Sequence, residues 1–261
     1  MEENTQITPP SYDEMIRNIS DDQKTILHNI LELHCPETSR NENGQLYYEM
    51  DFTYSEGKYY TPCKGDNATI PQPKYKLDVF PQAADIIKIE PLGPLPFDDN
   101  SIESINCDLP FVISVGPSMG NGNDKSNIIS NRFASYYPRE NMFESYHHWI
   151  TEAYRVLKPG GILAFKCQGT VSSALNLLTP EFSWLMATSC GFYPKDQFFL
   201  QAKARLHSGK IKQQQHARKF TSTFWVFEKS IKKRDLRYFK WMSNEQKENF
   251  INNFKTQIMV I

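Results

Sequence analysis

The chain has 261 residues, of which 39% are hydrophobic and 23% are charged, with a formal net charge of -1. Domains usually hold about 100–200 residues, so this length predicts one large domain or one domain with extensions. Ordinary apolar content, without any run near the roughly 18 residues of a membrane span, excludes a transmembrane protein, a disordered chain and a long coiled coil. The five cysteines form no C-x-x-C pair, so neither a disulfide framework nor a metal site is expected. The amino terminus is acidic and lacks the apolar core of a secretory signal, which favours a cytoplasmic protein.

The small net charge is the sum of two opposed segments. Residues 1–100 carry 18 acidic against 8 basic side chains, a balance of -10, whereas residues 201–240 carry 12 basic against 2 acidic side chains, a balance of +10. A basic segment this dense indicates contact with a polyanion. For a charge run taken alone, a solvated charged face is the commoner explanation.

In the first half of the chain, periodicity predicts one helix and a series of short strands. Between residues 21 and 33, apolar side chains recur at helical spacing behind an Asp21-Asp22 cap. Apolar runs of strand length follow, separated by turn residues; they lie at residues 47–51, 75–79, 85–89 and 102–107. A long polar loop comes next, from Gly116 to Asn131, and loops of this length are usually functional or disordered.

A helix, a turn and a strand are predicted after this loop. Apolar side chains repeat at three and four from Glu140 to Leu157, the Lys158-Pro-Gly-Gly161 run ends that helix, and a buried strand follows at residues 162–166. Residues 172–190 are a further helix candidate, which Pro180 either breaks or begins.

The last part of the chain predicts a hairpin and a tail. Two β-rich segments, residues 197–202 and 221–227, flank a basic loop and can pair with each other, and the tail from residue 231 is basic and then helical. Strands that alternate with helices before a terminal hairpin indicate an α/β sandwich around a mainly parallel sheet.

The most informative motif is the tetrapeptide Asp108-Leu109-Pro110-Phe111, which follows the strand expected at residues 102–107. Ligands of open α/β sheets bind beyond the carboxyl ends of the strands, so a site is expected here. The Asp108 carboxylate and the neighbouring carbonyls offer acceptors, and Phe111 offers a flat apolar face. That set suits a nucleobase with an exocyclic amino group, which brings two N–H donors and a ring that stacks. The simpler alternative is a strand end that turns through Pro110 with Phe111 in the core.

The tetrapeptide resembles the Asp/Asn-Pro-Pro-Tyr/Phe motif of the amino-group DNA methyltransferases, which methylate adenine N6 or cytosine N4 with S-adenosylmethionine. Leu109 stands where that motif usually has its first proline, and the related ribosomal-RNA adenine dimethyltransferases carry leucine there. The resemblance implies a Rossmann-like class I methyltransferase fold with a terminal antiparallel hairpin. It also implies direct methyl transfer to a flipped base, with adenine N6 as the expected target and without a metal or a covalent intermediate.

The resemblance extends through residues 75–165 and implies cofactor contacts. Asp78, at the tip of a strand, matches the acidic residue that takes the ribose hydroxyls of the cofactor, and Glu90 matches a residue near its adenine. Residues 95–102 resemble the family's Leu-Pro-Phe turn, and residues 154–163 resemble the turn before its fifth strand, which positions structure and performs no chemistry.

The family's cofactor loop has a glycine-rich form, Asp-Pro-Phe-x-Gly-Ser-Gly, because close backbone approach to the cofactor tolerates no Cβ. Residues 51–57 resemble this form with one glycine lost, which makes Asp51, Ser55 and Gly57 the candidate cofactor-binding residues. The tyrosine-rich continuation to Tyr60 indicates a phage or mobile-element branch of the family, hence a bacterial or phage-infected cell. A tyrosine-rich surface loop is the alternative.

The basic loop at residues 203–220 interleaves cations with Gln and His, a combination that suits phosphates and base edges. Its candidate nucleic-acid-binding residues are Lys203, Arg205, Lys210, Lys212, Arg218 and Lys219. In the resembling family, the sixth and seventh strands form such a hairpin on the face of the catalytic tetrapeptide. DNA is therefore the expected partner, and RNA the other candidate.

These matches divide the chain into three parts. Residues 1–40 form an N-terminal helical extension, residues 41–229 the methyltransferase domain, and residues 230–261 a basic helical tail; residues 112–140 and 203–220 are the expected target-contact insertions.

Three alternative functions differ in kind from a DNA methyltransferase. They are the same enzyme acting on RNA, a catalytically inactive nucleic-acid-binding subunit with a degraded cofactor loop, and a small-molecule methyltransferase, which the basic hairpin disfavours.

Overall fold

The computed structural model describes residues 15–63, 68–113, 135–136, 139–172, 175–203, 216–231, 241–249 and 252. The chain divides into two compact units, Met1–Ser230 and Ile231–Ile261. In the second unit, residues 244–249 are helical; every other element described below belongs to the first unit. Among the described residues, no helix has the length and apolar character needed to cross a membrane.

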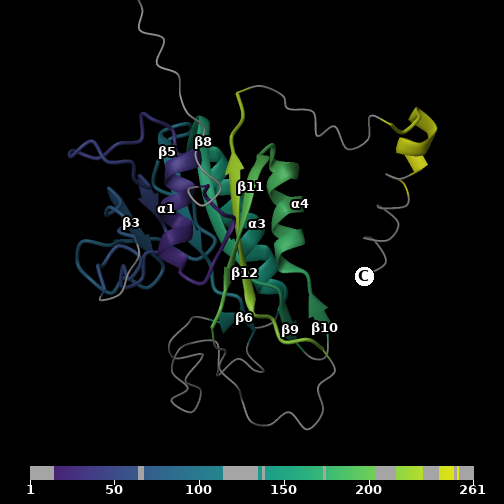
Figure 1. Cartoon of the computed structure of the whole chain (residues 1–261), viewed down its shortest axis with the longest axis horizontal. Coiled ribbons are helices and arrows are strands. Elements are labelled where there is room, and N and C mark those ends of the chain that lie inside the picture. Colours follow the sequence, from purple (N-terminus) through teal and green to yellow (C-terminus); the bar gives the residue numbers. More distant parts are fainter. Residues whose placement is uncertain are drawn as a thin grey trace, which may run out of the picture. The chain divides into compact units, whose positions relative to one another are not determined.

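An eight-stranded sheet runs through the first unit in the order β1-β11-β12-β8-β5-β2-β3-β4 (Figure 1). Its strands are β1 (Ile19–Ser20), β2 (Met50–Asp51), β3 (Tyr75–Asp78), β4 (Ile87–Lys88), β5 (Ile102–Asp108), β8 (Leu157–Cys167), β11 (Tyr193–Gln201) and β12 (Thr221–Glu228). Neighbours are parallel except in the two pairings that β12 makes, with β8 and with β11. The prediction of a mainly parallel sheet with an antiparallel hairpin near its end is therefore confirmed.

Two further pairs of short strands lie outside this sheet. β6 (Val112–Ile113) and β7 (Ser135–Tyr136) pair in parallel, and β9 (Thr170–Ser172) and β10 (Leu175–Leu177) form an antiparallel hairpin. The polar loop expected between Gly116 and Asn131 falls outside the described residues.

Helices cover both faces of the sheet. The described helices of the first unit are α1 (Gln23–His34), α3 (Glu140–Val156) and α4 (Thr179–Cys190). Along β8, Ile162 and Ala164 pack in one buried cluster with α1, whereas Leu163 and Phe165 pack in a second cluster with α3 and α4. Successive side chains of a strand point to opposite faces, so α1 lies on one face and α3 and α4 on the other.

The helices begin where their sequences predict, with one correction. Asp22 caps α1 and accepts the N–H groups of Lys24 at 3.0 Å and Thr25 at 3.3 Å. The helix proposed for residues 172–190 is wrong in its first part, because residues 170–172 and 175–177 are strands β9 and β10, which pair with each other. Proline lacks an N–H and fits the first turn of a helix, and Pro180 accordingly lies in the first turn of α4.

The first part of β8, which contains the Lys158-Pro-Gly-Gly161 run, depends on a close approach of two backbones. A Cβ on Gly161 would lie 2.8 Å from the carbonyl oxygen of Glu103 and 2.9 Å from that of Lys158. Only glycine fits between these atoms without displacement. The run follows the end of α3 as predicted, but it belongs to β8 and is not a turn before that strand; it brings the start of β8 against β5.

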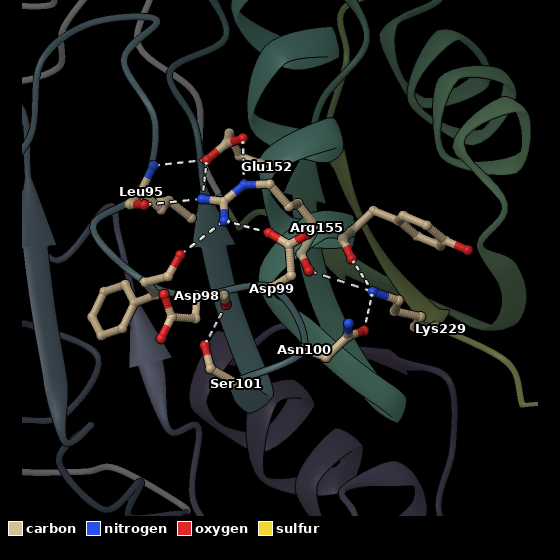
Figure 2. Close-up of polar contacts among 10 residues, drawn as sticks. Leu95, Asp98, Asp99, Asn100, Ser101, Glu152, Arg155 and Lys229 are labelled. Atoms are coloured by element: carbon tan, nitrogen blue, oxygen red, sulfur yellow. Dashed lines mark hydrogen bonds and ion pairs between the residues drawn. The ribbon is translucent and has the colours of Figure 1, made fainter.

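Arg155, in the last turn of α3, fixes the loop that leads into β5 (Figure 2). Its guanidinium donates to the carbonyl oxygens of Leu95 at 2.9 Å and Phe97 at 2.8 Å, and to the Asp99 carboxylate at 2.9 Å. It also forms a forked ion pair with Glu152, with N–O distances of 3.0 and 2.8 Å. Burial alone would raise the pKa of Glu152, but the guanidinium and the Leu95 N–H lower it below its usual value.

Lys229, directly after β12, extends the same network. Its ammonium donates to the Asn100 side chain at 2.8 Å and to the Tyr154 carbonyl at 2.7 Å, as Figure 2 shows. The Asn100 N–H in turn donates to the Arg155 carbonyl at 3.0 Å. The two motifs recognised in the sequence, residues 95–102 and 154–163, therefore contact each other directly, and together they fix the starts of β5 and β8.

Replacing Arg155 by lysine should destabilise the protein by about 1–3 kcal/mol, because a single ammonium cannot reproduce the forked contacts with Glu152 and the two carbonyls. Urea unfolding followed by circular dichroism measures the change. Arg139→Lys is the matched control, since Arg139 contacts the exposed Glu140 at 3.6 Å and exposed pairs contribute about 0–1 kcal/mol. Equal losses in the two variants would contradict the role given to Arg155.

Candidate active site

The order of the strands reverses between β2 and β5. Counted from β2, the chain adds β3 and β4 on one side of it and then β5 and β8 on the other. Doubly wound sheets have this arrangement, and their ligands bind outside the carboxyl ends of the strands at the point of reversal. Asp51 ends β2 and Asp108 ends β5, so two carboxylates lie at that point. Asp78 ends β3 at the same edge, and Lys166 of β8 is the register partner of Asp108.

The loop after β2 contacts Asp108 and Asp78, the two partly exposed aspartates of this edge. The Thr53 hydroxyl accepts the backbone N–H of Asp108 at 2.8 Å, and the Ser55 N–H donates to the Asp78 carboxylate at 2.8 Å. The other oxygen of Asp78 accepts the N–H of Phe80, whose ring is 67% exposed. Three segments that the sequence assigns to one site, namely the loop, Asp78 and the tetrapeptide, are therefore in direct contact.

Asp51 is fully buried and is satisfied by protein donors. One oxygen accepts the N–H and the hydroxyl of Thr53, at 2.8 and 2.9 Å, and the other accepts the Tyr60 hydroxyl at 2.6 Å and the Asn106 amide at 2.9 Å. Burial raises the pKa of Asp51 to about 6, although these donors oppose the shift. This carboxylate holds the base of the loop, so we expect it to shape a ligand site rather than to contact the ligand.

The loop keeps its turn although one glycine is missing. Ser55 has a φ of +52° and Gly57 a φ of +65°, both in the left-handed region. Ser55 occupies the position where the resembling loop has the lost glycine. At Gly57 the dihedral favours glycine, and a Cβ there would also meet the ring of Tyr54, which would have to move. The backbone conformation that glycine favours is therefore present at both positions.

Within the tetrapeptide, each residue has a different environment. Asp108 is partly exposed, and its Oδ2 accepts hydrogen bonds from the Tyr59 hydroxyl and from the Lys166 ammonium, the latter at 2.8 Å. Leu109 is buried in the core, Phe111 is half-buried, and the Pro110 carbonyl accepts the hydroxyl of Tyr146 at 3.0 Å. Of the two carbonyls considered as acceptors for an amino group, that of Pro110 thus already has a donor.

Several residues of the site were not recognised in the sequence, namely Tyr59, Tyr60, Asn106 and Lys166. Asn106 and Lys166 interrupt apolar strands that are otherwise buried, and both are themselves buried. A polar side chain inside a buried strand must have a partner, so its presence is a signal of a site or a network. The signal locates the residue but does not identify the partner.

The remaining cofactor candidate, Glu90, lies apart from these contacts. It follows β4, its side chain is exposed, and it forms an ion pair with Lys88 at 3.0 Å. Its proximity to a cofactor adenine stays a prediction.

Of the six basic candidates of the hairpin, Lys203, Arg218 and Lys219 are among the described residues. Lys203 pairs with Asp21 at 2.8 Å, the Arg218 guanidinium lies over the Phe220 ring at 5.8 Å, and Arg205, Lys210 and Lys212 fall outside the described residues. Lys219 borders a groove of about 420 Å³ between α4, the β9–β10 hairpin and the β11–β12 pair. The rings of Trp184, Phe199 and Trp225 also line this groove.

Comparisons with known proteins give little support for any assignment. No protein-family model matches the chain, and no curated protein matches it. Among solved structures, a candidate DNA modification methylase from Thermus thermophilus is similar over 59% of this chain and 53% of its own, with 15% identity and a TM-score of 0.30. The chain thus spans about half the length of that protein. A TM-score this low establishes neither a shared overall fold nor an activity, and the function depends on the chemistry of the site.

Proposed function

We propose that the protein transfers a methyl group from S-adenosylmethionine to the exocyclic amino group of a base flipped out of DNA, with adenine N6 as the target. The observation that carries this proposal is the contact of residues 53–55 with both Asp78 and Asp108. It joins acceptors suited to ribose hydroxyls and acceptors suited to an amino group at the reversal point of a doubly wound sheet. Donor and acceptor of the methyl group can therefore share one site.

The strand order supports a Rossmann-like class I arrangement. Numbered from β2, the strands β4-β3-β2-β5-β8 have the order 3-2-1-4-5, which is that of dinucleotide-binding sheets. The antiparallel pair of β12 and β11 extends this sheet beyond β8, as the resemblance to the methyltransferases implies.

The residues at the end of β3 fit S-adenosylmethionine. A carboxylate accepts hydrogen bonds from two neighbouring hydroxyls, which suits Asp78 to the ribose, and the exposed Phe80 ring beside it offers a stacking face for adenine. The left-handed turn at Ser55 and Gly57 allows the loop backbone to approach the cofactor closely. When bound, the cofactor supplies a methyl group activated by its sulfonium.

The tetrapeptide supplies the chemistry on the base. The amino nitrogen of adenine is a weak nucleophile because its lone pair is delocalised into the ring. Hydrogen bonds from its two N–H groups to Asp108 and to the Leu109 carbonyl draw the nitrogen toward tetrahedral geometry and free the lone pair. As the N–C bond forms, the bond between the methyl carbon and the sulfonium sulfur breaks and its electron pair goes to the sulfur; the nitrogen loses a proton, for which Asp108 is the acceptor that we assign. Phe111 holds the ring by stacking, which contributes about 1–3 kcal/mol.

The basic hairpin supports a nucleic acid as the substrate. Lys219, which precedes β12, borders the groove with its aromatic lining, and Arg218 is its neighbour in the chain. Cations neutralise phosphates and aromatic rings stack on bases, which is the combination that single-stranded segments and flipped bases require.

Addition of S-adenosylmethionine should raise the melting temperature of the protein, because a ligand that binds only the native state stabilises it. Asp78→Ala should weaken this binding by at least about 10-fold, the equivalent of one hydrogen bond to a charged acceptor. A thermal denaturation scan measures the melting temperature, and isothermal titration calorimetry measures the binding. Asp85→Ala is the control, since Asp85 is an exposed carboxylate that pairs with Lys76 at 2.8 Å. No binding by the wild type would refute the cofactor assignment.

DNA that has been incubated with the protein and S-adenosylmethionine should contain N6-methyladenine, which digestion to nucleosides and mass spectrometry identify. Asp108→Ala should abolish transfer and leave cofactor binding intact, because the carboxylate acts on the base and not on the cofactor. Asp98→Ala, which removes an exposed carboxylate from the loop before the same strand, should leave transfer unchanged. N4-methylcytosine in DNA, or methylated adenine only in RNA, would overturn the choice of target. Transfer by Asp108→Ala would overturn the mechanism.

A further inference from the structure

The Lys166 ammonium, near the end of β8, is tied to three oxygen atoms. It donates to Oδ2 of Asp108 at 2.8 Å, to the Tyr59 hydroxyl at 2.9 Å and to Oε1 of Gln23 at 3.3 Å. An ammonium has three N–H donors, so this set uses all of them. The side chain is only 10% exposed, and a charge removed from water to this degree requires pairing. The position of Lys166 is thus fully determined by its partners.

Tyr59 closes a triangle with Lys166 and Asp108. Its hydroxyl accepts a hydrogen bond from Lys166 and donates one to the same Oδ2 of Asp108. Burial, together with the nearby charge of Asp108, raises the pKa of Tyr59 well above its usual value, so the phenol keeps its proton and remains a donor. Oδ2 of Asp108 therefore receives two hydrogen bonds from the protein, whereas Oδ1 has no hydrogen-bond partner among the described residues.

The third partner of Lys166 connects the triangle to the N-terminal helix. Gln23 is the first residue of α1, and the next residue, Lys24, donates its ammonium to the Thr61 carbonyl at 2.6 Å. The start of α1 thus contacts both Lys166 and the end of the loop that carries Tyr59. The segment expected to be an extension therefore contacts this group of residues directly.

We propose that Lys166 and Tyr59 orient the Asp108 carboxylate so that Oδ1 alone is offered to the amino group of the substrate. The terminal torsion of an aspartate has broad wells, so an unrestrained carboxylate presents either oxygen in many directions. Two donors on Oδ2 remove that freedom, and a reacting group held in one orientation lowers the barrier to reaction. Lys166 is a positioning residue, and this inference rests on the proposed methyl transfer.

Lys166→Met removes the charge and the donors with little change in side-chain length. Steady-state kinetics on the nucleic acid that the wild type methylates should show kcat lowered by about 100-fold, because Asp108 loses its fixed orientation. KM for the nucleic acid and for the cofactor should change by less than about 3-fold, since neither is bound by Lys166. Tyr59→Phe removes one of the two donors on Oδ2 and should lower kcat by about 10-fold, an intermediate loss.

Lys195→Met is the matched control. Lys195 pairs with Glu228 at 2.7 Å in the same sheet, but Glu228 lies opposite Ile162, toward the other end of β8. This variant should lose stability without a loss in kcat.

Full activity of Lys166→Met overturns the inference, and so does a kcat loss of equal size in Lys195→Met. If Lys166→Met does not fold, the kcat of Tyr59→Phe provides the test: an unchanged kcat in that variant overturns the inference. If the wild type transfers no methyl group to DNA or RNA, the proposed function is overturned. If the wild type does transfer it and Lys166→Met has an unchanged kcat, only the role of Lys166 is overturned.

Discussion

The buried carboxylate of Asp51 is the constraint on which the site depends. A carboxylate removed from water costs several kcal/mol unless hydrogen bonds satisfy it, and four donors do so here. Two of the residues that donate to Asp51 also connect it to Asp108. Thr53 holds the backbone N–H of Asp108, and Tyr60 is adjacent to Tyr59, which contacts the Asp108 side chain. The position of the partly exposed Asp108 is therefore set by contacts with the buried Asp51.

The pairing of Asp108 with Lys166 also depends on the opposite end of the sheet. The two residues are register partners across β5 and β8, and a shift of β8 by one residue would turn Lys166 to the other face. The register is fixed where the strands begin, by the close approach at Gly161 and by the contacts of Arg155 with the loop before β5. Contacts that take no part in chemistry thus determine which side chain meets Asp108.

The sequence predicts seven strands of the main sheet, the helices and the strand-end carboxylates, because each depends on local periodicity or on a turn nearby; it does not predict β1 or the short pairs β6–β7 and β9–β10. It did not identify Lys166 or Tyr59, since the contact between them joins residues 107 apart, and a hydrophobic pattern indicates burial without naming a partner. The sequence predicts a helix from residue 172, which β9 and β10 contradict, because Pro180 can either break or begin a helix. Only the fold decides that the proline begins the helix.

The missing glycine of the cofactor loop bears on whether the protein is an enzyme at all. Loss of a glycine argues for an inactive relative only if the backbone conformation is lost with it. Ser55 holds a φ of +52°, which costs a non-glycine residue about 1–3 kcal/mol, and its N–H donates to Asp78 in that conformation. Such strain persists where the surrounding contacts impose it, and it is concentrated at functional sites. The backbone conformation of the loop is thus retained at Ser55, so the lost glycine does not by itself argue for an inactive protein.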